Sequence, residues 1–171
     1  GWRLRHPAHP DRPITLAQLL GHRAGLTDRI NYALPLGADL EAALKNAEAW
    51  DDARPPGGDF VYGNLNYPVV AAVVEGATGE RFDRAMTELV FRPLGIDACF
   101  NWPMCSDAAV ARAVVLYDSE GAVVRDDLRG ERPACPVVPA ADGSCDLASY
   151  RLARHGAGFS PQGGVRISAN G

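Results

Sequence analysis

Two side chains in the middle of the sequence carry groups suited to proton transfer and hydrogen bonding. They stand two residues apart in Tyr62-Gly63-Asn64. A phenol has an unperturbed pKa of about 10, which nearby cations lower, and a carboxamide both donates and accepts hydrogen bonds. The structural alternatives are a half-buried core position for Tyr62 and a helix-capping role for Asn64.

Four histidines are the other candidates for acid–base chemistry. His22 falls in a predicted tight loop, and we interpret it as a structural hydrogen-bonding residue rather than as a general base. His155 stands in a glycine-rich stretch and is expected to be exposed. His6 and His9 belong to a predicted solvated, extended arm at residues 1–13.

A glycine pair near the end of the chain is a candidate substrate-binding element. Gly163 and Gly164 close a loop that begins at residue 155. Two adjacent glycines permit close approach of a ligand to the backbone, and they equally permit a tight turn.

Four cysteines are confined to the stretch Cys99, Cys105, Cys135 and Cys145. An even number of cysteines predicts two disulfides in an oxidising compartment, so we expect a periplasmic or secreted protein. The sequence does not choose among the three pairings. The spacing fits no common zinc site, and four reduced, buried cysteines remain the alternative. We therefore predict neither a metal site nor a cofactor.

The elements that position these residues are mainly helical. Thr15 and Gln18 form a predicted capping box for a short helix that stops at Gly21. Apolar spacing predicts further helices over residues 39–50, 66–78 and from 81 to Pro93. The second of these has an expected apolar face of Val69, Val70, Val73, Val74 and Ala77, and the third has a stripe of Phe82, Met86, Leu89 and Val90. Residues 113–117 and 123–124 predict a β-hairpin.

The expected fold class is therefore mainly α with a small β-hairpin. We expect one partial domain over residues 1–171. Residues 1–96 form its helical part with the Tyr-x-Asn motif, residues 97–146 an irregular or β insertion with the cysteines, and residues 147–171 a glycine-rich return segment.

Composition excludes several classes of function. Hydrophobic residues make up 47% of the chain and charged residues 22%, as in folded domains rather than disordered ones. A net charge of -4 gives no electrostatic case for binding nucleic acid or anionic lipid. No apolar run reaches the ~20 residues of a membrane span, and residues 1–7 do not form a signal peptide, so any signal is expected upstream.

Three stretches stand in an order that is typical of one known family. The first is the helix and loop from Ile14 to Leu26, with a His-x-x-Gly-Leu ending. The second carries Pro56-Gly57, Tyr62-Gly63-Asn64, Thr78-Gly79 and Arg92-Pro93-Leu94-Gly95, and the third is Gly163-Gly164 with Ile167-Ser168-Ala169. Together they resemble the serine β-lactamase-related family of class C β-lactamases, D,D-peptidases and esterases. The resemblance covers nearly the whole chain except residues 97–146.

The sequence departs from the family pattern at both ends. The family's nucleophile lies in a Ser-x-x-Lys motif before this region, and a Lys-Thr-Gly or His variant follows it. No serine here is followed three residues later by lysine, and Lys45 is the only lysine. The chain therefore resembles the helical half of an α/β fold, as an internal fragment without the nucleophile. A designed segment that begins at Gly1 and ends at Gly171 would show the same departures from the family pattern.

The resemblance implies a role for each motif residue. Tyr62 would move protons between serine, lysine and the leaving group, and Asn64 would donate to a substrate carbonyl and accept from the lysine ammonium. The full-length parent would be a penicillin-recognising serine hydrolase acting on a small-molecule or peptide substrate, and the fragment would be inactive. The alternative is a non-catalytic binding module. Exposed apolar surface, through which the fragment would dimerise, distinguishes the two.

Overall fold

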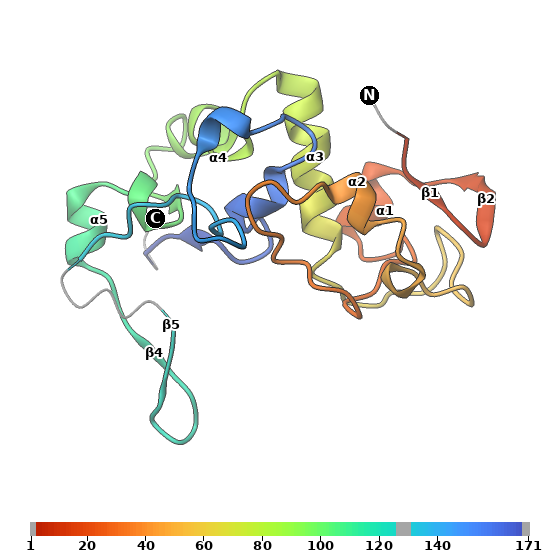
Figure 1. Ribbon diagram of the computed structural model, residues 1–171, viewed down its shortest axis with the longest axis horizontal. Coiled ribbons are helices and arrows are strands. Elements are labelled where there is room, and N and C mark those ends of the chain that lie inside the picture. The colour runs from red at the N-terminus through yellow and green to blue at the C-terminus, as the bar shows by residue number, and fades with distance from the viewer. Residues whose placement is uncertain (1–2, 126–130, 169–171) are drawn as a thin grey trace.

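The longest helix runs through the middle of the molecule and organises the elements around it. The computed structural model describes residues 3–125 and 131–168. Helix α3 (Asn66–Thr78) packs against α1 (Leu16–Leu20), against α4 (Phe82–Met86) and against the short turn η5 (Gly156–Phe159). In Figure 1 the chain starts at the end with β1 and β2, crosses to the α5 end, comes back beside α3 at η5 and then turns again toward the α5 side.

Helix α1 confirms the predicted start and stop signals. The hydroxyl of Thr15 accepts from the amide of Gln18, and the side chain of Gln18 accepts from the amide of Thr15. Gly21 ends the helix. The reciprocal capping box satisfies two amide groups that a five-residue helix would otherwise leave to water.

Helix α3 has the predicted bounds but not the predicted buried face. Val69 is buried as expected, whereas Val73 and Ala77 are exposed. The buried positions of the helix also include Ala72 and Glu75. A short apolar helix offers more than one hydrophobic stripe, and the neighbouring elements decide which of them is covered. Gly79 ends the helix in the left-handed conformation with φ of 70°.

The helix that follows changes its geometry in the middle. Residues Phe82–Met86 are α-helical, and residues Thr87–Phe91 form a π-helical turn, η2. The wider turn shifts the buried side of the helix, so that Phe91 is buried and Leu89 is 64% exposed. The predicted position of Leu89 in the buried stripe is therefore wrong.

The predicted helix over residues 39–50 is broken into two short pieces. Helix α2 covers Leu40–Ala43, and the 3-10 turn η1 covers Ala47–Ala49. The side chain of Asn46 accepts from the amide of Glu48 and starts the second piece. A side chain that bonds the local backbone in this way competes with continuation of the helix.

The strands form three separate two-stranded antiparallel sheets. Their members are β1 (Arg5–His6) with β2 (His9–Pro13), β3 (Cys99–Phe100) with β6 (Val165–Arg166), and β4 (Leu116–Tyr117) with β5 (Val123–Arg125). The last pair confirms the predicted hairpin, which projects from the body of the molecule in Figure 1. The remaining short turns and helices are η3 (Trp102–Met104), α5 (Asp107–Ala111) and η4 (Leu147–Ser149).

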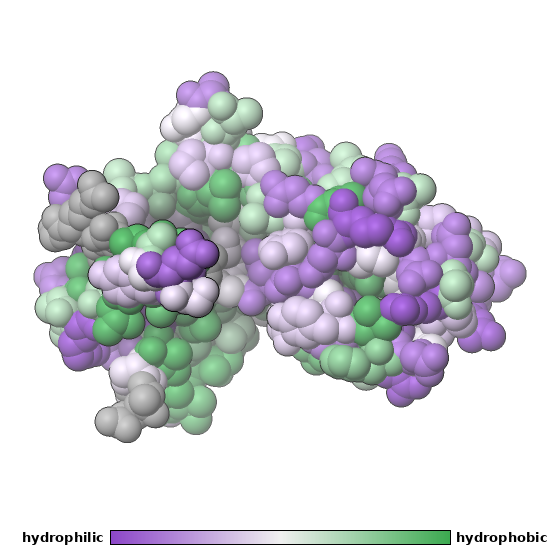
Figure 2. Space-filling view, turned by 90° about the horizontal axis from the view of Figure 1, so that it is seen from below, coloured by the Kyte–Doolittle hydropathy of each residue, from purple (hydrophilic) through white to green (hydrophobic). Residues whose placement is uncertain are grey.

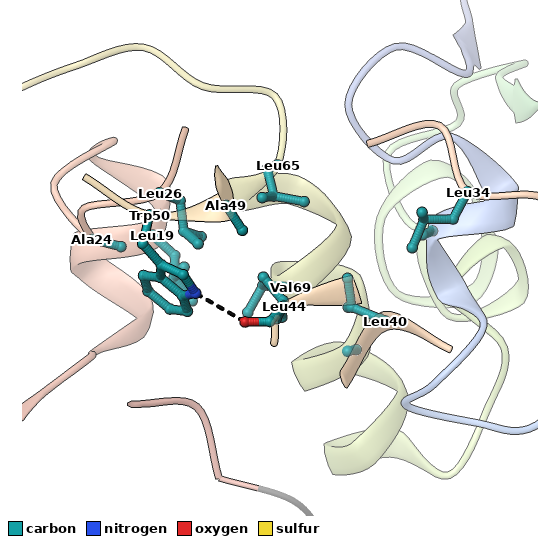
Figure 3. Packing of buried hydrophobic residues seen from close by; sticks show 12 residues of the cluster. Leu19, Ala24, Leu26, Leu34, Leu40, Leu44, Ala49, Trp50, Leu65 and Val69 are labelled. Atoms are coloured by element: carbon teal, nitrogen blue, oxygen red, sulfur yellow. Dashed lines mark hydrogen bonds between the residues drawn. The ribbon is translucent and has the colours of Figure 1, made fainter. Parts of the chain in front are cut away.

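Trp50 lies at the centre of the first hydrophobic cluster. Its indole Nε1 donates to the carbonyl oxygen of Leu44 at 2.9 Å. Figure 3 shows this hydrogen bond beside Leu19 and Leu26, with Leu34 at the far side of the cluster. The cluster joins α1, α2 and α3, so these elements form one packed unit.

Two disulfides lie in the segment from Cys99 to Cys145, which contributes to a second and a third hydrophobic cluster. Cys99 pairs with Cys105, and Cys135 pairs with Cys145. The second pair borders a cluster of Phe82, Phe91, Phe100 and Phe159. Within residues 3–125 and 131–168, no helix is long and apolar enough to span a bilayer.

Candidate functional site

Tyr62 and Asn64 meet in front of the first turn of α3. The hydroxyl of Tyr62 donates to Oδ1 of Asn64 at 3.2 Å. Tyr62 is 59% exposed and Asn64 is partly buried, so the pair faces solvent from a supported base. The alternative of a core position for Tyr62 is therefore wrong.

Asp28 holds this pair from behind, and sequence reasoning missed it. Its carboxylate accepts from the backbone amides of Asn64 and Leu65 and from Nδ2 of Asn64. Asp28 therefore fixes the backbone turn just before α3. No side chain among the described residues caps this helix, so the alternative that Asn64 caps it is wrong. No local pattern in the sequence points to Asp28, because its partners lie 36 and 37 residues further along the chain.

His22 supports the motif from the other side. Its Nδ1 accepts from the amide of Gly63 at 3.3 Å, and its ring lies 4.6 Å from the ring of Tyr62. The backbone carbonyl of His22 also accepts from the amide of Val61. His22 is buried and contacts the motif through both its backbone and its ring, which fits the predicted structural role.

Gly63 and Asn66 complete the turn between the pair and α3. Nδ2 of Asn66 donates to the carbonyl oxygen of Gly63 at 2.9 Å, and the Oδ1 of Asn66 is buried without a partner among the described residues. A Cβ on Gly63 would meet its nearest neighbours at 3.4 to 3.6 Å, which is ordinary contact. The turn therefore accommodates alanine or serine at this position.

The loop that carries His22 and Asp28 depends on a glycine. Gly25 has φ of +80°, and a Cβ there would lie 2.5 Å from the carbonyl oxygen of Arg54 and 2.8 Å from the ring of His6. Only glycine relieves both the conformational and the steric conflict. The glycine of the His-x-x-Gly-Leu stretch thus has a packing role.

The structure places Gly163 and Gly164 beside β3 and β6, away from the start of α3. A Cβ on Gly164 would lie 2.7 Å from the carbonyl oxygens of Phe159 and Ser160, so this glycine serves a tight turn. Gly163 lines a hollow of about 280 Å³ together with Trp102 and Arg112.

Two histidines that the sequence placed in solvent are buried. His6 packs against Trp50, its Nδ1 accepts from the amide of Ala8, and its Nε2 faces the carbonyl oxygen of Asp51 at 3.2 Å. His155 packs edge-on against Tyr150. Burial lowers the pKa of both imidazoles, because it disfavours the charged form. The predicted solvated position of His6 and the predicted exposure of His155 are therefore wrong, whereas the other described residues of the arm are exposed or partly exposed.

Glu75 is a buried acid on α3 outside the motif. Its carboxylate accepts from the amides of Phe82 and Ala153 and from the hydroxyl of Tyr150. Desolvation raises the pKa of Glu75, although these donors favour its charged form. Glu75 ties α3 to α4 and to the return segment, which makes it a structural junction.

At Tyr62 the structure thus fixes an exposed phenol against a partly buried amide. A phenol can pass a proton, and an amide can bind a carbonyl group or an ammonium group. The motif itself supplies no nucleophile.

Comparison with known protein families gives a match that covers nearly the whole chain. A family model described as Beta-lactamase matches residues 3–171. Penicillin-binding protein 4 of Amycolatopsis lactamdurans is 26% identical over 95 residues, which covers 54% of this chain and 24% of that protein. Unguisins hydrolase ungD' of Aspergillus campestris is 26% identical over 94 residues, which covers 51% of this chain and 17% of that protein. The chain spans about a quarter or less of the length of these curated relatives.

Solved structures show the same fold. EstCE1, a hydrolase with promiscuous acyltransferase activity, matches with a TM-score of 0.59 and 23% identity over 97% of this chain and 45% of its own. A mutant class C beta-lactamase matches with a TM-score of 0.56 and 10% identity, over 92% and 35% of the two chains. D-amino acid amidase from Ochrobactrum anthropi SV3 matches with a TM-score of 0.51 and 14% identity, over 94% and 42%.

Proposed function

Because the chain belongs to the beta-lactamase family, we propose that Tyr62 and Asn64 form one wall of the active site of a serine hydrolase. The full-length protein would cleave an amide or an ester through an acyl-serine intermediate. The 171 residues would be the helical half of that fold, and their expected location is the periplasm or the outside of the cell. The two disulfides support an oxidising compartment.

The proposed chemistry assigns a separate task to each side chain. Tyr62 would transfer the proton between the serine, a lysine and the leaving group. Asn64 would donate from Nδ2 to the substrate carbonyl and accept at Oδ1 from the lysine ammonium. The single observation that carries this proposal is the exposed hydroxyl–amide pair at 3.2 Å, anchored on its inner side by Asp28.

The test measures acylation of the full-length protein by a fluorescent penicillin and by a p-nitrophenyl ester. We expect Tyr62→Phe to slow acylation by about 10²- to 10⁴-fold, the usual contribution of a positioned proton-transfer group. Tyr117→Phe is the control for loss of a phenol hydroxyl, because Tyr117 lies on the projecting hairpin and outside the motif. Equal rates for Tyr62→Phe and wild type would contradict the assigned role.

We further propose that the isolated chain of 171 residues is inactive. It contains no Ser-x-x-Lys motif, and without a nucleophile only weak residual catalysis by binding groups is expected. Incubation of the isolated chain with the same penicillin should give no covalent adduct in a mass spectrum. A stoichiometric adduct on serine would refute this part of the proposal.

Gly163 and Gly164 remain proposed substrate-binding positions for the complete protein. Gly163 offers the better support, because it lines the hollow beside Trp102 and Arg166. The guanidinium of Arg166 lies over the Trp102 ring, so the hollow combines an aromatic wall with a cation.

A non-catalytic binding module is the alternative function, and the surface favours an incomplete fold. Figure 2 shows hydrophobic surface gathered at the end that carries α5 and the β4–β5 hairpin, whereas the end with β1 and β2 is largely hydrophilic. Exposed apolar side chains there are Val114, Leu116, Tyr117, Val123, Val124, Val165 and Ile167. A groove of about 560 Å³ also opens between α1 and α3, lined by Leu16, Leu19, Val69 and Val73.

We propose that the rest of the hydrolase covers this surface and that isolated chains pair through it. Contiguous apolar surface of this kind is rare on monomers and favours association. Sedimentation equilibrium should show a dimer that Val124→Asp weakens, while Lys45→Asp, on another exposed segment, leaves the dimer intact. A wild-type chain that stays monomeric at high concentration would support the independent module.

A further inference from the structure

Asp28, in the loop after α1, gathers three hydrogen bonds from the start of the Tyr62 motif. Its Oδ2 accepts from the backbone nitrogen and from Nδ2 of Asn64, each at 2.8 Å. Its Oδ1 accepts from the amide of Leu65 at 3.0 Å. Two of these three bonds hold the backbone of the turn before α3, whereas the bond to Nδ2 holds the side chain of Asn64.

The chemistry of the carboxylate fixes which end of the Asn64 amide faces it. An ionised carboxylate only accepts hydrogen bonds, so Nδ2 of Asn64 must point toward Asp28. The Oδ1 atom then points toward Tyr62, and because an amide oxygen also only accepts, the Tyr62 hydroxyl must be the donor. The hydrogen bonds therefore run in one direction, from Tyr62 to Asn64 and from Asn64 to Asp28.

We infer that Asp28 is a positioning residue, which orients the Asn64 amide and through it the hydroxyl of Tyr62. This inference rests on the proposed function, since orientation matters to catalysis only if Tyr62 and Asn64 act on a substrate. The fixed orientation leaves the lone pairs of the Tyr62 oxygen and the second hydrogen of Asn64 Nδ2 without partners among the described residues. These are the groups that a proton transfer and a substrate carbonyl require.

Loss of the Asp28 carboxylate would remove the preference for one orientation of the Asn64 amide. The two ends of a carboxamide have nearly the same shape, so a half-turn of the Asn64 side chain costs little packing energy. In the turned state Nδ2 would donate to the Tyr62 oxygen and occupy a lone pair, and the amide hydrogen would no longer face the substrate. Hydrogen bonds to charged groups are about twice as strong as neutral ones, which is why a carboxylate holds the amide better than a carbonyl oxygen would.

The experiment compares Asp28→Asn and Asp28→Ser with Asp146→Asn. Asparagine and serine at position 28 both keep an oxygen that can accept from the backbone amides of Asn64 and Leu65, and both remove the carboxylate. Asp146 also accepts a backbone amide, from Ala148 at 2.8 Å, but lies on η4 and outside the motif. The measurements are the side-chain NH2 resonances of Asn64 by NMR and the kcat, KM and pH profile of the full-length protein with a chromogenic ester.

We expect both Asp28 variants to shift the Asn64 NH2 resonances upfield while the amide of Leu65 stays protected. The kcat should fall by about 10- to 100-fold, the usual effect of a misplaced catalytic group, with KM little changed and the pH profile displaced. Asp146→Asn should leave all of these values unchanged. Asp28→Asn combined with Asn64→Ala should be no slower than Asn64→Ala alone, because Asp28 acts through Asn64.

Unchanged Asn64 resonances in the Asp28 variants, or additive losses in the double variant, would overturn the inference. So would a lower melting temperature with unaltered kcat and pH profile, the result for a residue that only holds the backbone turn before α3. If the wild-type protein hydrolyses neither ester nor β-lactam, the proposed function fails, whereas the Asn64 resonances still decide whether Asp28 orients the amide.

Discussion

Two regions of the molecule are stabilised in different ways. They are the N-terminal region, residues 3–96, and the cysteine region, residues 97–146. The first is built on side chains that are almost completely removed from water, such as Leu40, Leu65 and Trp50. In the described part of the second, the buried hydrophobic residues are Cys99, Phe100, Trp102, Cys105 and Val137, and both disulfides lie within it. Covalent links thus reinforce a smaller core in the second region.

This difference in stabilisation indicates which region can hold the Tyr62-Gly63-Asn64 motif in a fixed position. Tyr62 and Asn64 stand just before α3, which the first hydrophobic cluster supports, and their hydrogen-bond partners come from the same region. The cysteine region instead presents an exposed hairpin and few buried contacts. A positioned phenol requires the first kind of support, because catalytic geometry tolerates little displacement.

The largest expected effect comes from truncating the core of the N-terminal region. Leu65→Ala removes a fully buried side chain directly behind the motif. We expect a loss of about 2–5 kcal/mol in the free energy of unfolding, from lost burial and the cavity left behind. Urea unfolding followed by Trp fluorescence measures it. Leu89→Ala, at an exposed position, is the control, and an equal loss in both variants would contradict the buried-core assignment.

Removal of one disulfide should have a smaller and more local effect. We expect Cys135→Ser with Cys145→Ser to cost about 2–4 kcal/mol by the loop-entropy account. Hydrogen exchange should rise in residues 131–159, which border the second cluster, and stay unchanged in α1 and α3. Faster exchange throughout α3 would show that the two regions are not separately stabilised.

Tyr150→Phe tests the contact that joins the return segment to α3. The change removes one donor from the buried carboxylate of Glu75, and we expect a loss of about 1–3 kcal/mol. Fewer donors raise the pKa of Glu75 further above its usual value of 4.5, so the charged form suffers most. The loss should therefore be larger at pH 8 than at pH 5, as measured by urea unfolding. A loss that is independent of pH would mean that Glu75 is not involved.

The smallest expected effect is a pH dependence that arises from buried histidine. The pKa of His6 is lowered from 6.5 by burial, so below that pH the unfolded chain binds a proton that the folded chain refuses. Stability should fall as pH decreases from about 7 through 6.5 toward the lowered value, by at most about 1.4 kcal/mol per pH unit. His6→Gln should reduce this slope in urea titrations. A slope equal to that of wild type would indicate that His155 or another group dominates.

The sequence correctly predicted the parts of the fold that depend on interactions between neighbouring residues. The capping box at Thr15, the bounds of α3 with Gly79 and the β4–β5 hairpin all follow from residues close in sequence. The Tyr62–Asn64 pair itself also came from the sequence, as did its family. The roles of these two residues in catalysis stay a prediction.

Long-range packing decided the features that the sequence did not predict. His6 looked solvated because its partner, Trp50, lies far along the chain. The π-helical turn that exposes Leu89 depends on which neighbours cover the helix. Asp28 was missed because its hydrogen bonds reach 36 and 37 residues ahead.

The hydrogen bonds described around Tyr62 all connect positions between His22 and Asn66. The supporting loop and the supported motif are thus encoded in one continuous stretch of sequence. Recombination within the family could therefore exchange residues 22–66 as one segment. Such an exchange would keep Tyr62 together with the groups that orient it. Chimaeras joined inside the stretch should lose that alignment, while chimaeras joined at its borders should keep it.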